Sequence, residues 1–172
     1  IQGPTDLTPG GFLNRQPENF KPTSPTEVIG TRAHELALCF VLPTPLICLC
    51  DNPKNYEGQP GLEYLDQLKA TWDETLALQG KIGEFYICAR RNGDDWYIGM
   101  IGDDMAQKHT VPLTFLKDGV TYKAQIFRDK EDSITDACAI EIAEEEVTKD
   151  TTLEIKTVRN GGYVAILKPV QK

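Results

Sequence analysis

Three aspartates are the side chains of this sequence that are best placed to do chemistry. Asp6, Asp51 and Asp73 each follow a stretch that we expect to be a strand. In barrels of alternating strands and helices, the residues that follow the strands meet at one end and form the active site. Carboxyl groups that face each other there can act as general acid and base. The three aspartates are therefore candidates for the rim of a ligand pocket.

A structural role is the alternative for each of these aspartates, and the loop composition favours it. Aspartate beside proline or asparagine commonly caps a helix or closes a turn with its side chain. Asp51 stands in such a setting, directly before Asn52 and Pro53. Asp6 is the best functional candidate, because its loop is rich in glycine and a glycine backbone can approach a ligand closely.

Other reactive side chains do not form a recognisable catalytic or metal-binding pattern. His34 lies in an expected helix and His109 near an expected strand, and neither has a serine or cysteine nucleophile at a familiar spacing. Gly10-Gly11 lacks the strand and helix context of a phosphate loop. The five cysteines are odd in number and without zinc-site spacing, so we expect buried free thiols. They are Cys39, Cys48, Cys50, Cys88 and Cys138.

Charge and hydropathy exclude several partners. The formal net charge is -8, with acidic residues concentrated between Glu141 and Asp150. Nucleic-acid binding needs clustered Lys and Arg, so we expect no nucleic-acid partner, and the acidic stretch is typical of a solvated face. The apolar run from Leu36 to Leu49 is interrupted by Pro43 and is too short to span a bilayer. No signal segment opens the chain, so we expect any export signal to lie upstream or to have been removed.

The first half of the chain has the pattern of an α/β protein. Apolar spacing predicts a helix over 28–42, which Pro43 ends because proline lacks a backbone donor. The continuous apolar run 45–50 predicts a strand that is buried on both faces, as in a parallel sheet. A second helix over 61–68 and a short strand over 71–75 follow. This order of helix, buried strand, helix and strand is that of a barrel or a wound sheet.

From residue 82 onward, short runs of alternating polar and apolar residues recur at intervals of about ten residues. Asn92-Gly93 predicts a hairpin, and Asn160-Gly161-Gly162 predicts another tight turn. The pattern predicts an antiparallel β-sandwich. The seven expected strands are 84–91, 95–102, 110–115, 121–128, 137–147, 151–158 and 163–168.

The predicted fold class is therefore α+β, with a partial (β/α) barrel segment over 1–81 and an all-β antiparallel sandwich over 82–172. A complete (β/α)8 barrel needs about 250 residues, which is far more than the first part contains. Either its elements lean on the sandwich or the chain is a piece of a larger protein. The abrupt opening at Ile1 favours a piece.

A series of motifs in order and spacing resembles glycoside hydrolase family 97 over nearly the whole chain. One position departs from the family pattern: Thr5-Asp6-Leu7 stands where Met-Asp-Tyr is expected, which removes an aromatic ring that would contact sugar. The motifs are Gly3-Pro4-Thr5-Asp6-Leu7-Thr8-Pro9-Gly10-Gly11-Phe12, Thr31-Arg32-Ala33-His34-Glu35-Leu36-Ala37, Asp51-Asn52-Pro53-Lys54-Asn55-Tyr56, Thr71-Trp72-Asp73-Glu74-Thr75, Ala89-Arg90-Arg91, Asp95-Trp96-Tyr97-Ile98-Gly99 and Gly161-Gly162-Tyr163-Val164-Ala165-Ile166.

The resemblance implies an exo-acting enzyme of three parts: an N-terminal β-sandwich, a catalytic (β/α)8 barrel and a C-terminal β-sandwich. Members cleave α-linked glucosides or galactosides, use calcium, and are typically periplasmic or otherwise secreted. This chain would supply the last barrel units and the C-terminal sandwich. The family's catalytic carboxylates and calcium ligands lie upstream of the Gly3–Phe12 motif. The resemblance thus implies no catalytic residue and no metal ligand in this chain, whose partners would be the upstream domains and, in the intact enzyme, an oligosaccharide.

Two other classes of function remain alternatives. A stand-alone carbohydrate-binding module would stack sugar rings on exposed aromatics, and an oligomerisation or scaffold module would form a homo-oligomer. The mid-strand position of Trp96 and Tyr97 favours packing over sugar stacking. The aromatic candidates are Trp72, Trp96, Tyr97, Tyr122 and Tyr163.

Overall fold

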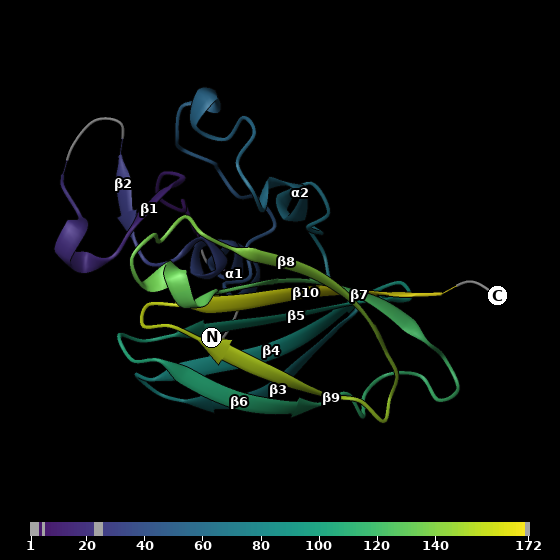
Figure 1. Ribbon diagram of the computed structural model, residues 1–172. Coiled ribbons are helices and arrows are strands. Elements are labelled where there is room, and N and C mark those ends of the chain that lie inside the picture. Colours follow the sequence, from purple (N-terminus) through teal and green to yellow (C-terminus); the bar gives the residue numbers. More distant parts are fainter. Residues whose placement is uncertain (1–3, 5, 23–25, 171–172) are drawn as a thin grey trace.

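The computed structural model describes residues 4, 6–22 and 26–170, and it is mostly β-structure with few helices (Figure 1). Six strands form one antiparallel sheet in the order β3-β4-β5-β10-β7-β8, and β6 pairs with β9 in a separate antiparallel ribbon. All seven strands expected after residue 82 are present as β4 to β10. The bounds are β3 Glu74–Lys81, β4 Phe85–Asn92, β5 Asp95–Gly102, β6 Gln107–Pro112, β7 Tyr122–Arg128, β8 Glu141–Val147, β9 Thr152–Thr157 and β10 Gly162–Pro169.

The turns and the alternation of side chains form this sheet as expected. Asn92 pairs with Asp95 across the β4–β5 hairpin, and Gly93 has the positive φ of 60° that such a tight turn requires. Asn160, before β10, also adopts a left-handed conformation. Along β9 the side chains of Leu153 and Ile155 are buried, while their neighbours point outward.

The two faces of the large sheet cover two different cores. One face packs against the β6–β9 ribbon, and this core contains Trp96, Ile98, Ile126, Ile155 and Tyr163. The opposite face packs against the helical region above the sheet in Figure 1, in a core that includes Leu36, Phe40, Tyr64, Phe127 and Val164. Because both faces are covered, β10 is buried from Gly162 to Leu167.

The main helix begins later than the sequence predicts. Residues 27–29 form β2 (Glu27–Ile29), which pairs in parallel with β1 (Leu13–Arg15), and α1 spans Arg32–Val41. Gly30 has a φ of +119°, which interrupts any helix there, and the Thr31 hydroxyl accepts a hydrogen bond from the His34 backbone N–H at 3.1 Å. Thr31 is thus the N-cap, and the β-branched residues before it extend rather than coil.

The buried strand predicted over 45–50 is wrong. The segment has no regular structure, and the side chain of Leu46 is 75% exposed. No described strand pairs with this segment, so its apolar run lacks the neighbours that a strand buried on both faces requires. The predicted burial of Cys48 and Cys50 is wrong for the same reason, whereas Cys39 and Cys88 are buried free thiols.

The remaining elements of the first half are shorter or differently paired than predicted. The second helix is α2 (Leu62–Leu65), preceded by Gly61 with a φ of 93°. The strand predicted over 71–75 begins at Glu74, and it is an antiparallel edge strand of the sandwich sheet rather than a parallel strand. The sheet therefore includes residues before 82, and a partial barrel over the first 81 residues stays a prediction. No helix in the described part of the chain is long and apolar enough to cross a membrane.

Candidate functional site

Asp51 ties two loops together. Its Oδ2 accepts a hydrogen bond from the Phe12 backbone N–H at 2.6 Å, and its Oδ1 accepts from the Asn52 N–H and the Asn55 amide, both at 2.7 Å. Partial burial works to raise the pKa of Asp51, but these hydrogen bonds outweigh it and hold the pKa below its usual value. The structure thus gives Asp51 a turn-forming role, as the structural alternative predicts.

Asp73 closes the β4–β5 hairpin. Its Oδ2 accepts a hydrogen bond from the Gly93 backbone N–H at 2.7 Å and lies 3.5 Å from the Arg91 guanidinium. Asp6 is exposed. Among the residues that the structure describes, no hydrogen bond or ion pair joins any two of the three aspartates, and their place on a substrate rim stays a prediction.

Arg32, at the start of α1, holds the same loop as Asp51, and the sequence reasoning missed it. Its side chain is fully buried and donates to the Phe12 carbonyl at 2.6 Å, to Asn14 Oδ1 at 2.7 Å and to the Pro60 carbonyl at 2.9 Å. Burial lowers the pKa of Arg32. An arginine in the first turn of a helix lies unfavourably close to the positive end of the helix dipole. This unusual position was the signal in the sequence that could have indicated a special role for Arg32.

Glu35 lies one turn further along α1, and its side chain is only 5% exposed. Burial raises the pKa of Glu35 to about 7, although the positive charge of Arg32 works in the opposite direction. A carboxyl group with a raised pKa is typical of catalytic acids. Here it sits on the buried face of the helix, beneath the loop that Arg32 holds.

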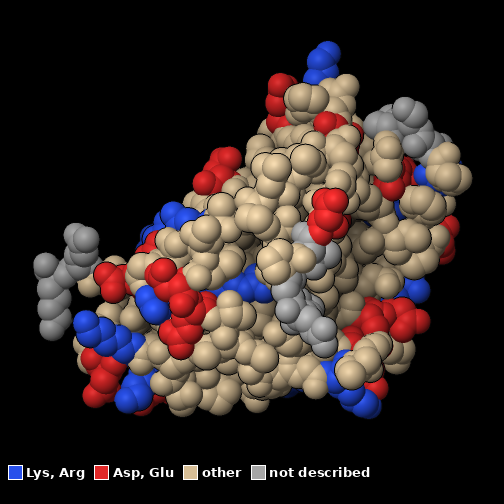
Figure 2. Space-filling model, turned by 180° about the vertical axis from the view of Figure 1, so that it is seen from behind, with Lys and Arg blue, Asp and Glu red and all other residues tan. Residues whose placement is uncertain are grey.

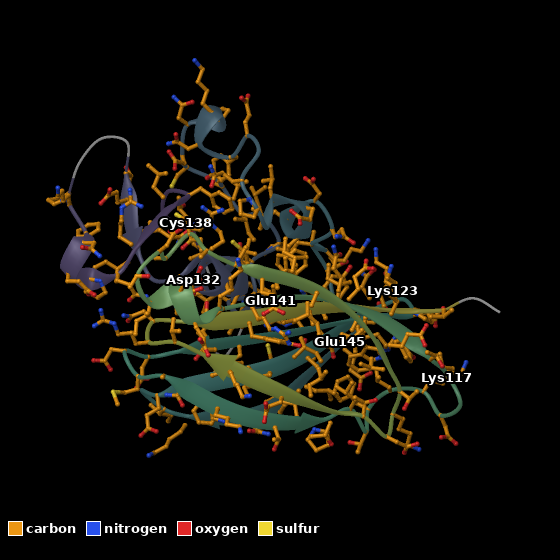
Figure 3. All side chains as sticks on the ribbon, viewed as in Figure 1. Lys117, Lys123, Asp132, Cys138, Glu141 and Glu145 are labelled. Carbon is orange, nitrogen blue, oxygen red and sulfur yellow. The ribbon has the colours of Figure 1, made fainter. Side chains whose placement is uncertain are left out.

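A polar cavity of the sandwich contains internal candidates for a carboxylate pair. It has a volume of about 700 Å³ and lies between β9 and the edge formed by β7 and β8. Glu141 and Glu145 line it from β8, where Figure 3 labels them. Arg128 binds both, through Nη2 to Glu141 at 2.5 Å and through Nη1 to Glu145 at 3.7 Å.

The electrostatics of this cavity do not fit a glycosidase pair. The hydrogen bond from Arg128 lowers the pKa of Glu141, whereas a general acid needs a raised one. Burial raises the pKa of Asp129, in the same cavity, to about 6. However, Asp129 Oδ2 accepts from the backbone N–H groups of Val158 at 3.1 Å and Gly162 at 3.3 Å, and so fixes the turn before β10. Each carboxylate therefore has a structural partner.

The aromatic candidates and histidines have packing roles. Trp96, Tyr97 and Tyr163 are each at most 5% exposed, and the half-buried Trp72 packs edge-on against Tyr97 at 4.9 Å. His34 Nδ1 lies 2.9 Å from the Gly161 carbonyl. In the described ranges, no group of three or more His, Cys, Asp or Glu side chains is arranged to hold a metal ion.

The fold thus defines a class: an antiparallel β-sandwich that packs one sheet face on a helical segment. Residues 71–168, more than half of the chain, match the family model described as glycosyl-hydrolase 97 C-terminal, oligomerisation. The chain therefore belongs to glycoside hydrolase family 97, as its sequence motifs indicate, and corresponds to the C-terminal region of that family.

Two related proteins extend this match to the first half of the chain. A retaining α-galactosidase from Bacteroides thetaiotaomicron is 34% identical over 170 residues, which are 98% of this chain and 26% of that enzyme. A probable retaining α-galactosidase from Streptomyces bingchenggensis is 29% identical over 168 residues, covering 96% of this chain and 24% of that protein. This chain thus spans about a quarter of their length.

A solved structure agrees over the same range. A glycoside hydrolase family 97 enzyme from Pseudoalteromonas sp. strain K8, in complex with acarbose, superposes with a TM-score of 0.83 at 29% identity. The match covers 98% of this chain and 27% of that enzyme. A β-arabinopyranosidase, at 22% identity and a TM-score of 0.66, shares the fold.

Proposed function

We propose that this chain is the C-terminal part of an exo-acting α-glycosidase, in which residues 4–73 complete a (β/α)8 barrel and the sandwich supports them. The observation that carries the proposal is the structural match to a family 97 enzyme over 98% of the chain, first half included. The parallel pairing of β1 with β2, with α1 directly after β2, supports the proposal, because such barrels are built from parallel strands that are followed by helices.

Exposed apolar side chains in the first half of the chain support the proposal that another part of the enzyme covers this region. Leu46 is 75% exposed, Ile29 49% and Leu49 46%. Leu46 and Leu49 lie in the irregular segment 45–50, which parts of the enzyme outside this chain would cover. Exposed apolar side chains fit a surface that is covered in the complete protein.

The sandwich supports α1 through a buried arginine. Arg90 on β4 is 3% exposed and donates hydrogen bonds to the carbonyls of Phe40 and Val41, the latter at 3.1 Å. These carbonyls belong to the last turn of α1, where the helix dipole is negative and a cation is stabilising. The guanidinium also lies 4.8 Å from the centre of the Phe40 ring. Arg90 therefore anchors the C-terminal end of α1 to the large sheet.

The proposed reaction is the hydrolysis of a terminal α-galactoside or α-glucoside. Two relatives are named retaining α-galactosidases, so α-galactosides are the first substrates to test. The catalytic carboxylates, and calcium with its ligands, would belong to parts of the enzyme outside this chain. The intact enzyme would act in the periplasm or outside the cell, as the family resemblance implies.

Oligomerisation is a second candidate function, because the matched family domain is described by that word. The sandwich would then hold copies of the enzyme together. A carbohydrate-binding module has less support, since three of its aromatic candidates, Trp96, Tyr97 and Tyr163, are buried in the two cores.

Turnover assays test where catalysis resides. The isolated chain is expected to give no turnover of p-nitrophenyl α-galactoside or α-glucoside. Co-expression with the polypeptide encoded upstream in the same gene is expected to give activity that neither part has alone. Activity of the isolated chain that Asp6→Ala or Asp129→Asn abolishes would contradict the proposal.

A further inference from the structure

The two edges of the large sheet differ in what they offer a partner. β3 and β8 are the edge strands, and within the described residues each pairs with only one neighbour. An open edge presents backbone donors and acceptors that a strand of another molecule can pair with. β8 carries four glutamates in seven residues, which would repel a second copy. β3 is uncharged from Thr75 to Gly80.

An apolar groove lies beside β3. Its volume is about 780 Å³, and it runs along β3, the β3–β4 hairpin and the end of β5. The side chain of Ile82, at the hairpin, is fully exposed. Figure 2 shows the molecule from behind the view of Figure 1, and much of the described surface on that face is uncharged. The apolar side chains that line the groove are Leu42, Leu78, Ile82, Phe85, Tyr86 and Ile101.

We propose that β3 is the edge through which a second copy of this chain docks, by antiparallel β3–β3 pairing about a two-fold axis. The proposal rests on the oligomerisation role put forward above and names its surface. The edge and most of the groove belong to residues 71–168, the part that matches the oligomerisation domain. A two-fold interface uses the same patch on both copies, so that patch must be complementary to itself.

β3 has this self-complementarity in its charges. If two β3 strands pair antiparallel about a centre between Ala77 and Leu78, Glu74 of each copy lies opposite Lys81 of the other. Opposite charges in facing positions stabilise a strand pair, whereas like charges destabilise it. Both side chains are accessible: that of Glu74 is 43% exposed and that of Lys81 67%. In the same register Thr75 faces Gly80 and Leu76 faces Gln79, so no like charges meet along the seam.

This pairing ends at two copies. It uses up the β3 edge of both molecules, and the edge of the large sheet that remains in each is the acidic β8 strand. β3 also has a bulge between Ala77 and Gln79, at the centre of the proposed seam, which bends the strand and divides the pairing into a short segment on each side. The groove and Ile82 flank the seam, where the segment that precedes β3 in the second copy would cover them.

Charge reversal tests the pairing directly. The dissociation constant would be measured by sedimentation equilibrium from about 1 to about 500 μM chain. Glu74→Lys and Lys81→Glu each place like charges at both ends of the seam, and each is expected to raise the dissociation constant at least about tenfold. The double variant restores opposite charges and is expected to return within about threefold of the original value. Within one copy Glu74 pairs with Arg91 and Lys81 with Glu84, and because these ion pairs are exposed, their loss should affect the fold little.

Two further measurements make the result specific to β3. Glu146→Lys, on the opposite edge strand, is the matched control and is expected to leave association unchanged. Amide hydrogen exchange in residues 75–80 is expected to slow as the chain concentration rises, because pairing protects the free edge.

The possible outcomes distinguish an error in the proposed β3 surface from an error in the proposed oligomerisation role. A dimer that is unaffected by either single reversal would overturn the β3 surface and leave an oligomerisation role intact. A chain that stays monomeric across the whole concentration range would overturn both, while the barrel-supporting role would stand on the assays described above. Weakening by each single variant with recovery in the double variant supports the proposal.

Discussion

The two faces of the six-stranded sheet are completed in different ways. One face is covered by the β6–β9 ribbon, which the same antiparallel sandwich supplies, and its core is closed by residues after 75. The other face is covered by α1 and by residues up to 72, whose outer side still exposes Leu46 and Leu49. The difference teaches that the sandwich strands close one core by themselves, whereas the other core also needs the first region, whose outer side still exposes apolar side chains.

Core truncations on the two faces are expected to give the largest effects. Ile98, in the first core, and Leu36, in the second, are both fully buried. Ile98→Ala should lower the free energy of unfolding by about 4 kcal/mol and Leu36→Ala by about 3 kcal/mol, through lost burial and the cavities left behind. Amide exchange should show that Ile98→Ala weakens protection throughout, while Leu36→Ala weakens it only in residues before 73.

Equal loss of protection in β7 and β9 for both variants would contradict the claim that the core beneath the β6–β9 ribbon is closed without the first region. Leu46→Ala serves as the control, since its exposed side chain should cost less than about 0.5 kcal/mol.

The pH dependence of stability is expected to sharpen the comparison on the helical side. Burial raises the pKa of Glu35 to about 7 from an ordinary value of 4.5, so the folded state keeps a proton that the unfolded state loses first. Stability therefore falls as the pH rises from about 4.5 to about 7, by about 3 kcal/mol. Glu35→Gln has no proton to lose, and at pH 8 it should be about 3 kcal/mol more stable than the original chain.

At pH 4 the two proteins should be equally stable, because Glu35 is then protonated in both states. Urea unfolding at pH 4, 6 and 8 measures this, with the exposed Glu57→Gln as control. Parallel stability curves for Glu35→Gln and the original chain would show that the carboxyl is not buried as described.

Two adjacent arginines on β4 give the smallest and most local comparison. Arg90 binds carbonyls at the end of α1, while Arg91 forms exposed ion pairs with Asp73 and Glu74. Arg90→Ala should cost about 2 kcal/mol, because it leaves buried carbonyls without a charged donor. Arg91→Ala should cost less than about 1 kcal/mol, since exposed pairs are screened. Thermal unfolding of both variants would decide, and equal costs would mean that Arg90 does not anchor the helix.

Sequence reasoning found the sandwich strands because their signals are local. In β9, alternation places Leu153 and Ile155 on one face, and such a pattern needs only six residues to be recognised. The same reasoning failed for 45–50, where continuous apolar residues fit a buried strand but no described strand lies beside them. It also misassigned the strand at 71–75, because composition does not reveal which partner a strand has.

The candidate site shows the same limit of sequence-based prediction: partners that are distant in the sequence are not predicted. The motifs around Asp51 and Asp73 were found, but their partners, the Phe12 N–H and the Gly93 N–H, lie 39 and 20 residues away in the sequence. Arg32 and Glu35 were not singled out, because their importance comes from burial, which depends on contacts with distant segments.

The sequence by itself determined the class of this protein: motifs in order gave the family, and alternation and turn residues gave the antiparallel sandwich. These properties are encoded locally, in side-chain period and backbone preference. Only the tertiary structure decided which carboxyl groups are buried and which sheet face holds the helix. It also decided that β3 is left as an open edge, which is uncharged from Thr75 to Gly80. Burial and pairing are relations between segments far apart in the chain, so they are fixed only when the segments pack together.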